Sequence, residues 1–100
     1  MVTMIALSSV QWSARRGKEP GEVVVEVKNT GNTVAFFLYL RTVKAGTEEE
    51  ITPVFWDDNF VSLMPRASRV LTVKGLPDAK QELEIRLDGW NVEARSLRVP

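Results

Sequence analysis

Two adjacent carboxylates, Asp57 and Asp58, lie among aromatic residues near the middle of the chain, in residues 54–65 (VFWDDNFVSLMP). Paired acids can act as general acid and base when both reach one substrate bond. In an extended strand, however, consecutive side chains point to opposite faces, so these two would not flank one bond. In a bend, Asp57, Asp58 and Asn59 would instead hydrogen-bond the local backbone. The stretch therefore predicts a strand, a bend and a second strand, and a structural role is favoured over catalysis.

Two residue types that often bind transition metals or take part in nucleophilic catalysis are missing from the sequence. The chain has no cysteine and no histidine, which excludes disulfides, thiolate nucleophiles, Ser-His-Asp triads and the usual zinc sites. Calcium could use the oxygen atoms of residues 57–59, but the ligand spacing of an EF-hand loop is absent. We therefore predict no catalytic residue, no metal site and no cofactor in this chain.

Aromatic residues are the second group that could form a functional surface. In residues 34–43, period-two alternation predicts two apolar faces, one with Val34, Phe36, Leu38 and Leu40 and the other with Ala35, Phe37 and Tyr39. The outward face of an antiparallel sheet is normally polar, so Phe37 and Tyr39 are either shielded by long neighbouring side chains or contact another domain. Arg41 would add to the polar rim of such a contact.

The three tryptophans, Trp12, Trp56 and Trp90, have two interpretations. They could form a sugar-stacking platform, or they could be core anchors whose indole N–H finds a backbone partner. Because buried aromatic residues dominate small cores, we favour packing for Trp56 and Trp90, each of which lies beside turn residues. Trp56 and residues 57–59 remain candidates for a loop presented towards a neighbouring domain.

The size and composition of the chain indicate one globular domain. It has 100 residues, of which 44% are hydrophobic and 26% charged, and its basic and acidic side chains number 13 each. This balance gives no net field for phosphate backbones or anionic lipid, so we expect no nucleic-acid or membrane partner. No run approaches the length of about 20 apolar residues that a membrane span needs. Residues 1–7 lack a basic leader and a long apolar core and do not predict a signal peptide.

The elements that must position these residues are strands. Alternating apolar residues predict strands over residues 11–16, 22–28, 34–43, 51–56, 60–64, 69–74, 81–88 and 92–99. Gly31 is the expected site of positive φ in the turn after residue 28, and the three glutamates of the loop at 44–50 are expected to be solvated. Proline interrupts almost every window long enough for a helix. We predict an all-β, immunoglobulin-like antiparallel β-sandwich of seven to eight strands, without a disulfide.

Four separated stretches, residues 28–32, 35–41, 53–65 and 87–91, occur in an order and at a spacing that resemble a known domain. They are similar to the C-terminal Ig-like domain of family 2 glycoside hydrolases of the β-mannosidase and exo-β-D-glucosaminidase type. Two positions depart from the family pattern, because Phe60 replaces a frequent tyrosine and Pro65-Arg66-Ala67 replaces Pro-Gly-Glu. Since arginine resists positive φ, the second change predicts a type I rather than a type II turn.

In this family, the resemblance places the chemistry in two glutamates of a separate (β/α)8 barrel that precedes this domain. Such a barrel takes about 250 residues. The resemblance therefore implies that residues 1–100 are one non-catalytic accessory domain from the C-terminus of a larger multidomain hydrolase, with the parent's other domains as partners. A free-standing module that binds carbohydrate and an adhesion-type Ig-like module are the alternatives from the residues alone. The compartment stays open, with a secreted or periplasmic parent compatible with the resemblance.

Overall fold

The computed structural model describes residues 8–77 and 82–100, and these form eight β-strands. The strands are β1 (Val10–Arg16), β2 (Val23–Asn29), β3 (Ala35–Lys44), β4 (Phe55–Trp56), β5 (Val61–Leu63), β6 (Ser68–Lys74), β7 (Leu83–Gly89) and β8 (Val92–Arg98). Among the residues described, no helix is long and apolar enough to cross a membrane. Residues 1–7, considered above as a leader, lie outside the described part. The predicted all-β class and strand number are confirmed.

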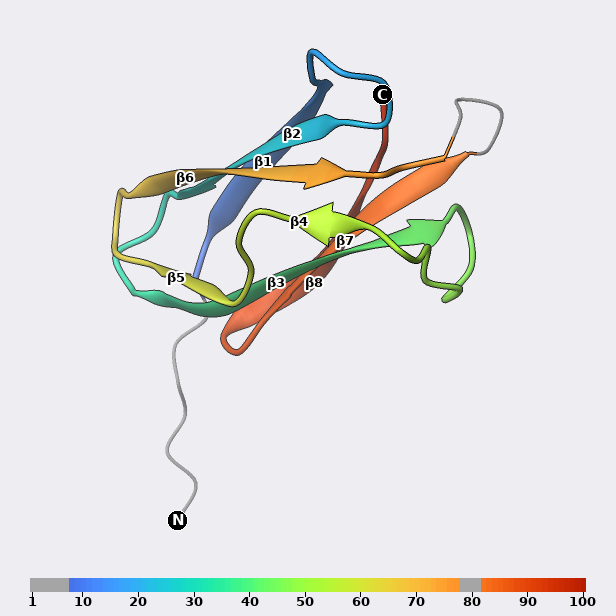
Figure 1. Cartoon of the computed structure of the whole chain (residues 1–100). Coiled ribbons are helices and arrows are strands. Elements are labelled where there is room, and N and C mark those ends of the chain that lie inside the picture. Colours follow the sequence, from blue (N-terminus) through green and yellow to red (C-terminus); the bar gives the residue numbers. More distant parts are fainter. Residues whose placement is uncertain (1–7, 78–81) are drawn as a thin grey trace.

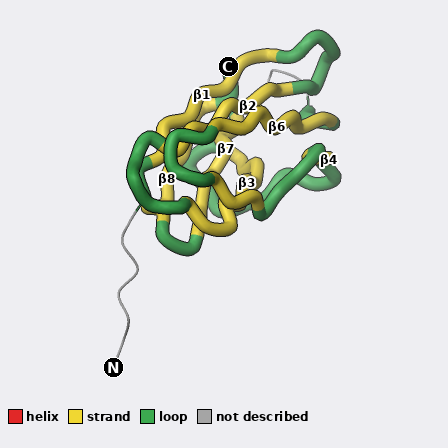
Figure 2. Tube along the Cα trace, turned by 90° about the vertical axis from the view of Figure 1, so that its left-hand side faces the viewer, coloured by secondary structure: helices red, strands yellow, loops and turns green. Residues whose placement is uncertain are grey.

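The strands form two four-stranded antiparallel sheets that pack face to face as a sandwich. One sheet has the order β1-β2-β6-β4 and the other the order β5-β3-β7-β8. In Figure 1, β1, β2 and β6 run together above β3, β7 and β8, and Figure 2 shows these strands after a turn of 90°. Because β4 and β5 follow one another in the chain but lie in different sheets, residues 57–60 cross from one sheet to the other.

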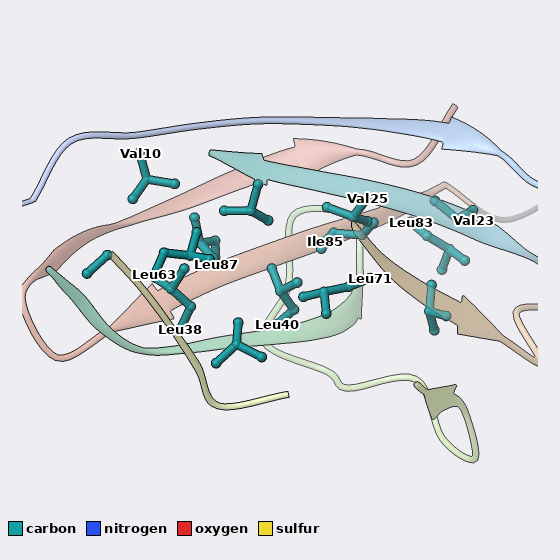
Figure 3. Packing of buried hydrophobic residues seen from close by; sticks show 14 of the residues in the cluster. Val10, Val23, Val25, Leu38, Leu40, Leu63, Leu71, Leu83, Ile85 and Leu87 are labelled. Atoms are coloured by element: carbon teal, nitrogen blue, oxygen red, sulfur yellow. The ribbon is translucent and has the colours of Figure 1, made fainter. Parts of the chain in front are cut away.

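The core lies between the sheets and consists of alternate residues of the facing strands. Val23, Val25 and Val27 of β2 are fully buried, and so are Ile85 and Leu87 of β7. Figure 3 shows buried side chains from both sheets filling the layer between them. Each buried valine, leucine or isoleucine stabilises the fold by about 1.5 to 3 kcal/mol relative to an exposed one. The period-two prediction for β2 and β7 is confirmed.

Strand β3 does not keep the predicted alternation. A β-bulge between Ala35 and Leu38 shifts its register against β5, and Phe37 has a left-handed backbone with φ 52°. Ala35 is fully buried together with Leu38 and Leu40, whereas Phe36 is only partly buried and lies outside the core cluster. The prediction that Phe36 shares the inner face with Leu38 is wrong, because the extra residue of a bulge reverses the faces of the residues before it.

The turn after β2 is closed by a side chain and not by a glycine with positive φ. The Gly31 N–H donates to the Oδ1 atom of Asn29 at 3.0 Å, which is an Asx turn. A Cβ atom at Gly31 would lie 3.3 Å from the backbone nitrogen of Ser9, so glycine allows a close approach of two backbones. The expectation of positive φ at this position is wrong, since the described glycines with positive φ are Gly21, Gly46 and Gly75.

The turn after β5 is type II, not type I as predicted. The Ala67 N–H donates to the carbonyl oxygen of Met64 at 3.0 Å, and this bond closes a turn with Pro65 and Arg66 at its centre. Arg66 has φ 69°, the left-handed conformation that a type II turn requires at its third residue. Two backbone bonds to Asn29, both 2.9 Å, hold Arg66 and Ala67 in this conformation.

Candidate functional site

The predicted bend contains Asp57, which extends the pairing of β4 with β6. Its N–H donates to the Thr72 carbonyl oxygen at 2.9 Å, and the Thr72 N–H donates to its Oδ1 atom at 2.8 Å. Trp56 already pairs with Val73 in the same ladder. The carboxylate of Asp57 therefore acts as a further backbone partner for β6.

Asn59 attaches the other end of the bend to the opposite sheet. Its Oδ1 atom accepts the Leu40 N–H and its Nδ2 donates to the Leu40 carbonyl oxygen, both at 2.8 Å. The side-chain amide thus pairs with β3 just beyond Leu38, where the pairing with β5 ends, as a neighbouring strand would. Because Asp57 binds one sheet and Asn59 the other, the bend ties the two sheets together. We call residues 57–59 the sheet tie.

Asp58, the middle residue of the sheet tie, has local partners. Its carboxylate accepts the Asn59 N–H at 2.8 Å and forms an ion pair with Arg69. Each of residues 57–59 thus uses a side-chain oxygen atom in a backbone or ion-pair contact of its own. Among the described residues, no three or more acidic, histidine or cysteine side chains gather into a group that could hold a metal ion. This geometry supports the structural interpretation of the bend.

The tryptophans divide between the core and the surface. Trp12 and Trp56 are partly buried and pack against the core cluster, which confirms the packing prediction for Trp56. The packing prediction for Trp90 is wrong, because Trp90 is 65% exposed in the turn between β7 and β8. The neighbouring Asn91 takes the buried position of this turn.

Five aromatic residues on or beside the strands of the β5-β3-β7-β8 sheet form two groups of contacting rings. Phe36, Phe37 and Trp90 have ring centroids 5.7 to 6.1 Å apart. Tyr39 stacks on Phe60 with a centroid distance of 4.8 Å and an interplanar angle of 16°. The exposed fraction is 54% for Phe37 and 63% for Phe60. We call these five residues the aromatic surface. The alternative that long neighbouring side chains shield Phe37 does not hold, whereas Tyr39 is partly covered by the ring of Phe60.

Arg41, the third residue predicted on this face, belongs to an ion-pair group. It donates to the carboxylate of Glu48 at 3.1 Å, and Arg86 of β7 pairs with the same carboxylate. The hydrogen bond from Arg41 and the charge of Arg86 lower the pKa of Glu48 below its ordinary value of 4.5. Glu48 is exposed, as expected for this loop, but it is paired with two arginines and is not simply solvated.

Two buried asparagines, which were not predicted as site residues, organise one end of the sandwich. Asn29 donates to the carbonyl oxygen atoms of Thr33 and Leu63 at 2.7 and 3.0 Å. Asn91 accepts the Phe36 N–H at 2.8 Å and donates to the Val34 carbonyl oxygen at 2.7 Å. A sequence signal existed for Asn29, because it continues the inward period-two series of β2.

Comparison with protein-family models gives a match to the exo-beta-D-glucosaminidase Ig-fold domain over residues 2–92. An exo-beta-D-glucosaminidase of Arthroderma benhamiae is 38% identical over 73 residues, which are 73% of this chain and 8% of that protein. A mannosylglycoprotein endo-beta-mannosidase of Lilium longiflorum is 35% identical over 74 residues, or 68% of this chain and 8% of that protein.

Solved structures give a similar result. The exo-chitosanase CsxA of Amycolatopsis orientalis superposes with a TM-score of 0.83 and 27% identity, and the match covers 94% of this chain and 12% of the enzyme chain. The chain therefore spans 8% of the length of the two curated relatives and 12% of the solved one.

Proposed function

Because this chain belongs to the Ig-fold domain family of exo-β-D-glucosaminidase-type glycoside hydrolases, we propose that it is a non-catalytic accessory domain of such an enzyme. The resemblance predicted from four sequence stretches, including its β-mannosidase branch, is confirmed. The proposed role is to pack, as a C-terminal sandwich, against the other domains of a β-mannosidase-like family 2 hydrolase.

Two findings together support this proposal. The Ig-fold domain family matches residues 2–92 of the chain, and the chain covers only 8% of the length of each curated relative. A catalytic (β/α)8 barrel takes about 250 residues, so the barrel of a parent enzyme would lie outside these 100 residues. The small share supports a domain that accompanies the catalytic unit.

The chemistry of the sheet tie agrees with this role. A retaining glycosidase needs two carboxyl groups about 5 to 5.5 Å apart across a sugar cleft, both free to act on one bond. Here Asp57 binds the backbone of Thr72, and Asp58 pairs with Arg69. Each acid is already used in holding the fold.

The proposal is tested by the parent open reading frame and by activity on aryl glycosides. We expect the frame to encode an upstream barrel with paired glutamates, and the parent to lose turnover when either glutamate is changed to glutamine. The 100-residue chain should give no turnover. A frame without a barrel, or activity of the chain that disappears in Asp57→Asn or Asp58→Asn, would contradict the proposal.

A further inference from the structure

We propose that the aromatic surface is the site at which another domain of the same polypeptide docks, through an apolar protein surface. This inference rests on the proposed accessory function and names the face that performs it. The surface consists of Phe36, Phe37, Tyr39, Phe60 and Trp90, on or beside the strands of the β5-β3-β7-β8 sheet.

The outer faces of the two sheets differ in how their exposed apolar side chains are arranged. On the β1-β2-β6-β4 sheet, exposed Phe55 and Val70 each pair with a charged residue, Lys74 and Glu26. On the other sheet, the exposed rings contact other aromatic rings, Phe37 with Trp90 and Phe60 with Tyr39. A gathered apolar patch on a small domain usually marks an interaction site, whereas isolated exposed residues do not.

The backbone supplies an independent observation. Three described residues other than glycine have positive φ, and two of them are the exposed Phe37 and Phe60, with φ 52° and 54°. A bulky residue in this conformation disfavours folding by about 5- to 30-fold relative to a relaxed backbone. Glycine or asparagine would reduce this cost. Strained residues that persist on a surface are typical of functional sites.

The ring geometry favours a protein partner over a sugar. Phe36 and Phe37 are tilted by 37°, Phe37 and Trp90 by 56°, and Phe36 and Trp90 by 77°. These rings therefore form an uneven apolar surface, whereas stacking of a pyranose ring needs a flat one. Tyr39 and Phe60 are nearly parallel, but each covers one face of the other. Tilted aromatic residues of this kind suit the interlocking side chains of a protein interface.

A polar rim continues the aromatic surface along the sheet. Tyr39 pairs with Asp88, and the next outward pair is Arg41 with Arg86. A hollow of about 180 Å³ beside them is lined by Arg41, Arg86, Asp88, Ala94, Arg95 and Ser96. Arg86 pairs with Glu84 as well as with Glu48, and Arg41 pairs with Glu48, so the charges of the rim are balanced. An apolar centre with a polar rim is the usual anatomy of an interface.

The length of the relatives indicates which kind of partner covers the aromatic surface. The chain matches 8% to 12% of those proteins, so most of each polypeptide lies outside the matched domain and is available to cover this face. Docking within one polypeptide also needs less intrinsic affinity than association of two free molecules, because the linker provides a high effective concentration.

Hydroxyl-radical footprinting of the full parent polypeptide and of the 100-residue chain tests the inference. We expect Phe37, Phe60 and Trp90 to be modified in the chain alone and to lose modification in the parent. Phe55 and Val70, which are exposed on the other sheet, should be modified equally in both. Equal modification of the aromatic surface in a parent that does contain the catalytic barrel would overturn the inference and leave the proposed function intact.

The double substitution Phe37→Asn and Phe60→Asn provides the matched variant, with Phe55→Asn as its control. In the chain alone, relief of the backbone offsets the lost ring contacts, so we expect the folding equilibrium constant to stay within about fivefold of the original. In the parent, the double variant should restore modification of Trp90, whereas Phe55→Asn should not. Unchanged protection of Trp90 in the double variant would refute the inference. So would protection of Trp90 in the isolated chain by glucosamine or mannose oligosaccharides, or by self-association.

Discussion

Replacing Asn59 by alanine tests whether the sheet tie holds the sandwich together. The half-buried Asn59 amide makes two 2.8 Å bonds to the backbone of Leu40, and the substitution leaves both of these backbone groups without a partner. Each unsatisfied group costs about 1 to 3 kcal/mol when water is excluded. Because the site is only partly buried, we expect Asn59→Ala to lower the free energy of unfolding by about 2 to 4 kcal/mol.

Urea denaturation followed by tryptophan fluorescence measures this loss. With an m-value of about 2 kcal/mol per molar urea, within the usual range for a small protein, the midpoint should fall by about 1 to 2 M. Asn32→Ala is the control, because the side chain of exposed Asn32 has one hydrogen-bond partner among the described residues, Arg66 at 3.3 Å, and the change should alter stability by less than about 0.5 kcal/mol. Equal midpoint shifts for the two variants would mean that water replaces the amide and that the tie adds no stability.

Asn59→Asp separates the two bonds of the same side chain. The carboxylate keeps the acceptor for the Leu40 N–H but loses the donor to the Leu40 carbonyl oxygen. At pH 7 it should therefore be less stable than the original chain, and this difference should shrink as the carboxyl group gains a proton near its ordinary pKa of about 3.9. A difference that is independent of pH would contradict the assigned donor.

Three further substitutions test single contacts. Thr42→Val should raise the free energy of unfolding by about 1 to 2 kcal/mol, because the fully buried Thr42 hydroxyl has no hydrogen-bond partner among the described residues. Arg66→Gly should raise the melting temperature through a gain of about 0.5 kcal/mol, since relief of positive φ exceeds the added flexibility of the unfolded chain; a lower melting temperature would contradict this. Glu48→Gln removes the partner of Arg41 and Arg86. Folding lowers the pKa of Glu48, so the stabilising effect of its carboxylate should be present above pH 4.5 and disappear as the pH falls through the lowered pKa. Urea unfolding of the two proteins should show this pH dependence, and the difference between them should decrease with added salt.

Strand positions could be predicted from the sequence wherever one face of a strand is buried. The valines of β2 and the alternating residues of β7 have a period of two because one side meets the core and the other meets solvent. The bulge in β3 could not be predicted in this way, since residues 34–40 are apolar at nearly every position and apolarity alone does not show where an extra residue enters.

The conformations of Gly31 and Arg66 show a second limit of sequence interpretation. Residue type predicts positive φ only as an average preference. Here backbone hydrogen bonds to Asn29 hold Arg66 at positive φ. At Gly31, a hydrogen bond to the side chain of Asn29 closes the turn without positive φ. The bend at residues 57–59 was predictable from its short polar side chains. Its partners, Thr72 and Leu40, were not, because they come from strands distant in the sequence.

The order of strands in the β5-β3-β7-β8 sheet has a consequence for synthesis of the protein. Strand β3 ends at Lys44, but its neighbour β7 begins only at Leu83. At a translation rate of about 5 to 20 residues per second, the nascent chain holds β3 without β7 for about 2 to 8 s. During this interval Leu38 and Leu40 lack the strand beside which they pack, so a ribosome-bound chaperone has a specific apolar segment to protect. We therefore expect the sandwich to close after β7 and β8 have left the ribosome.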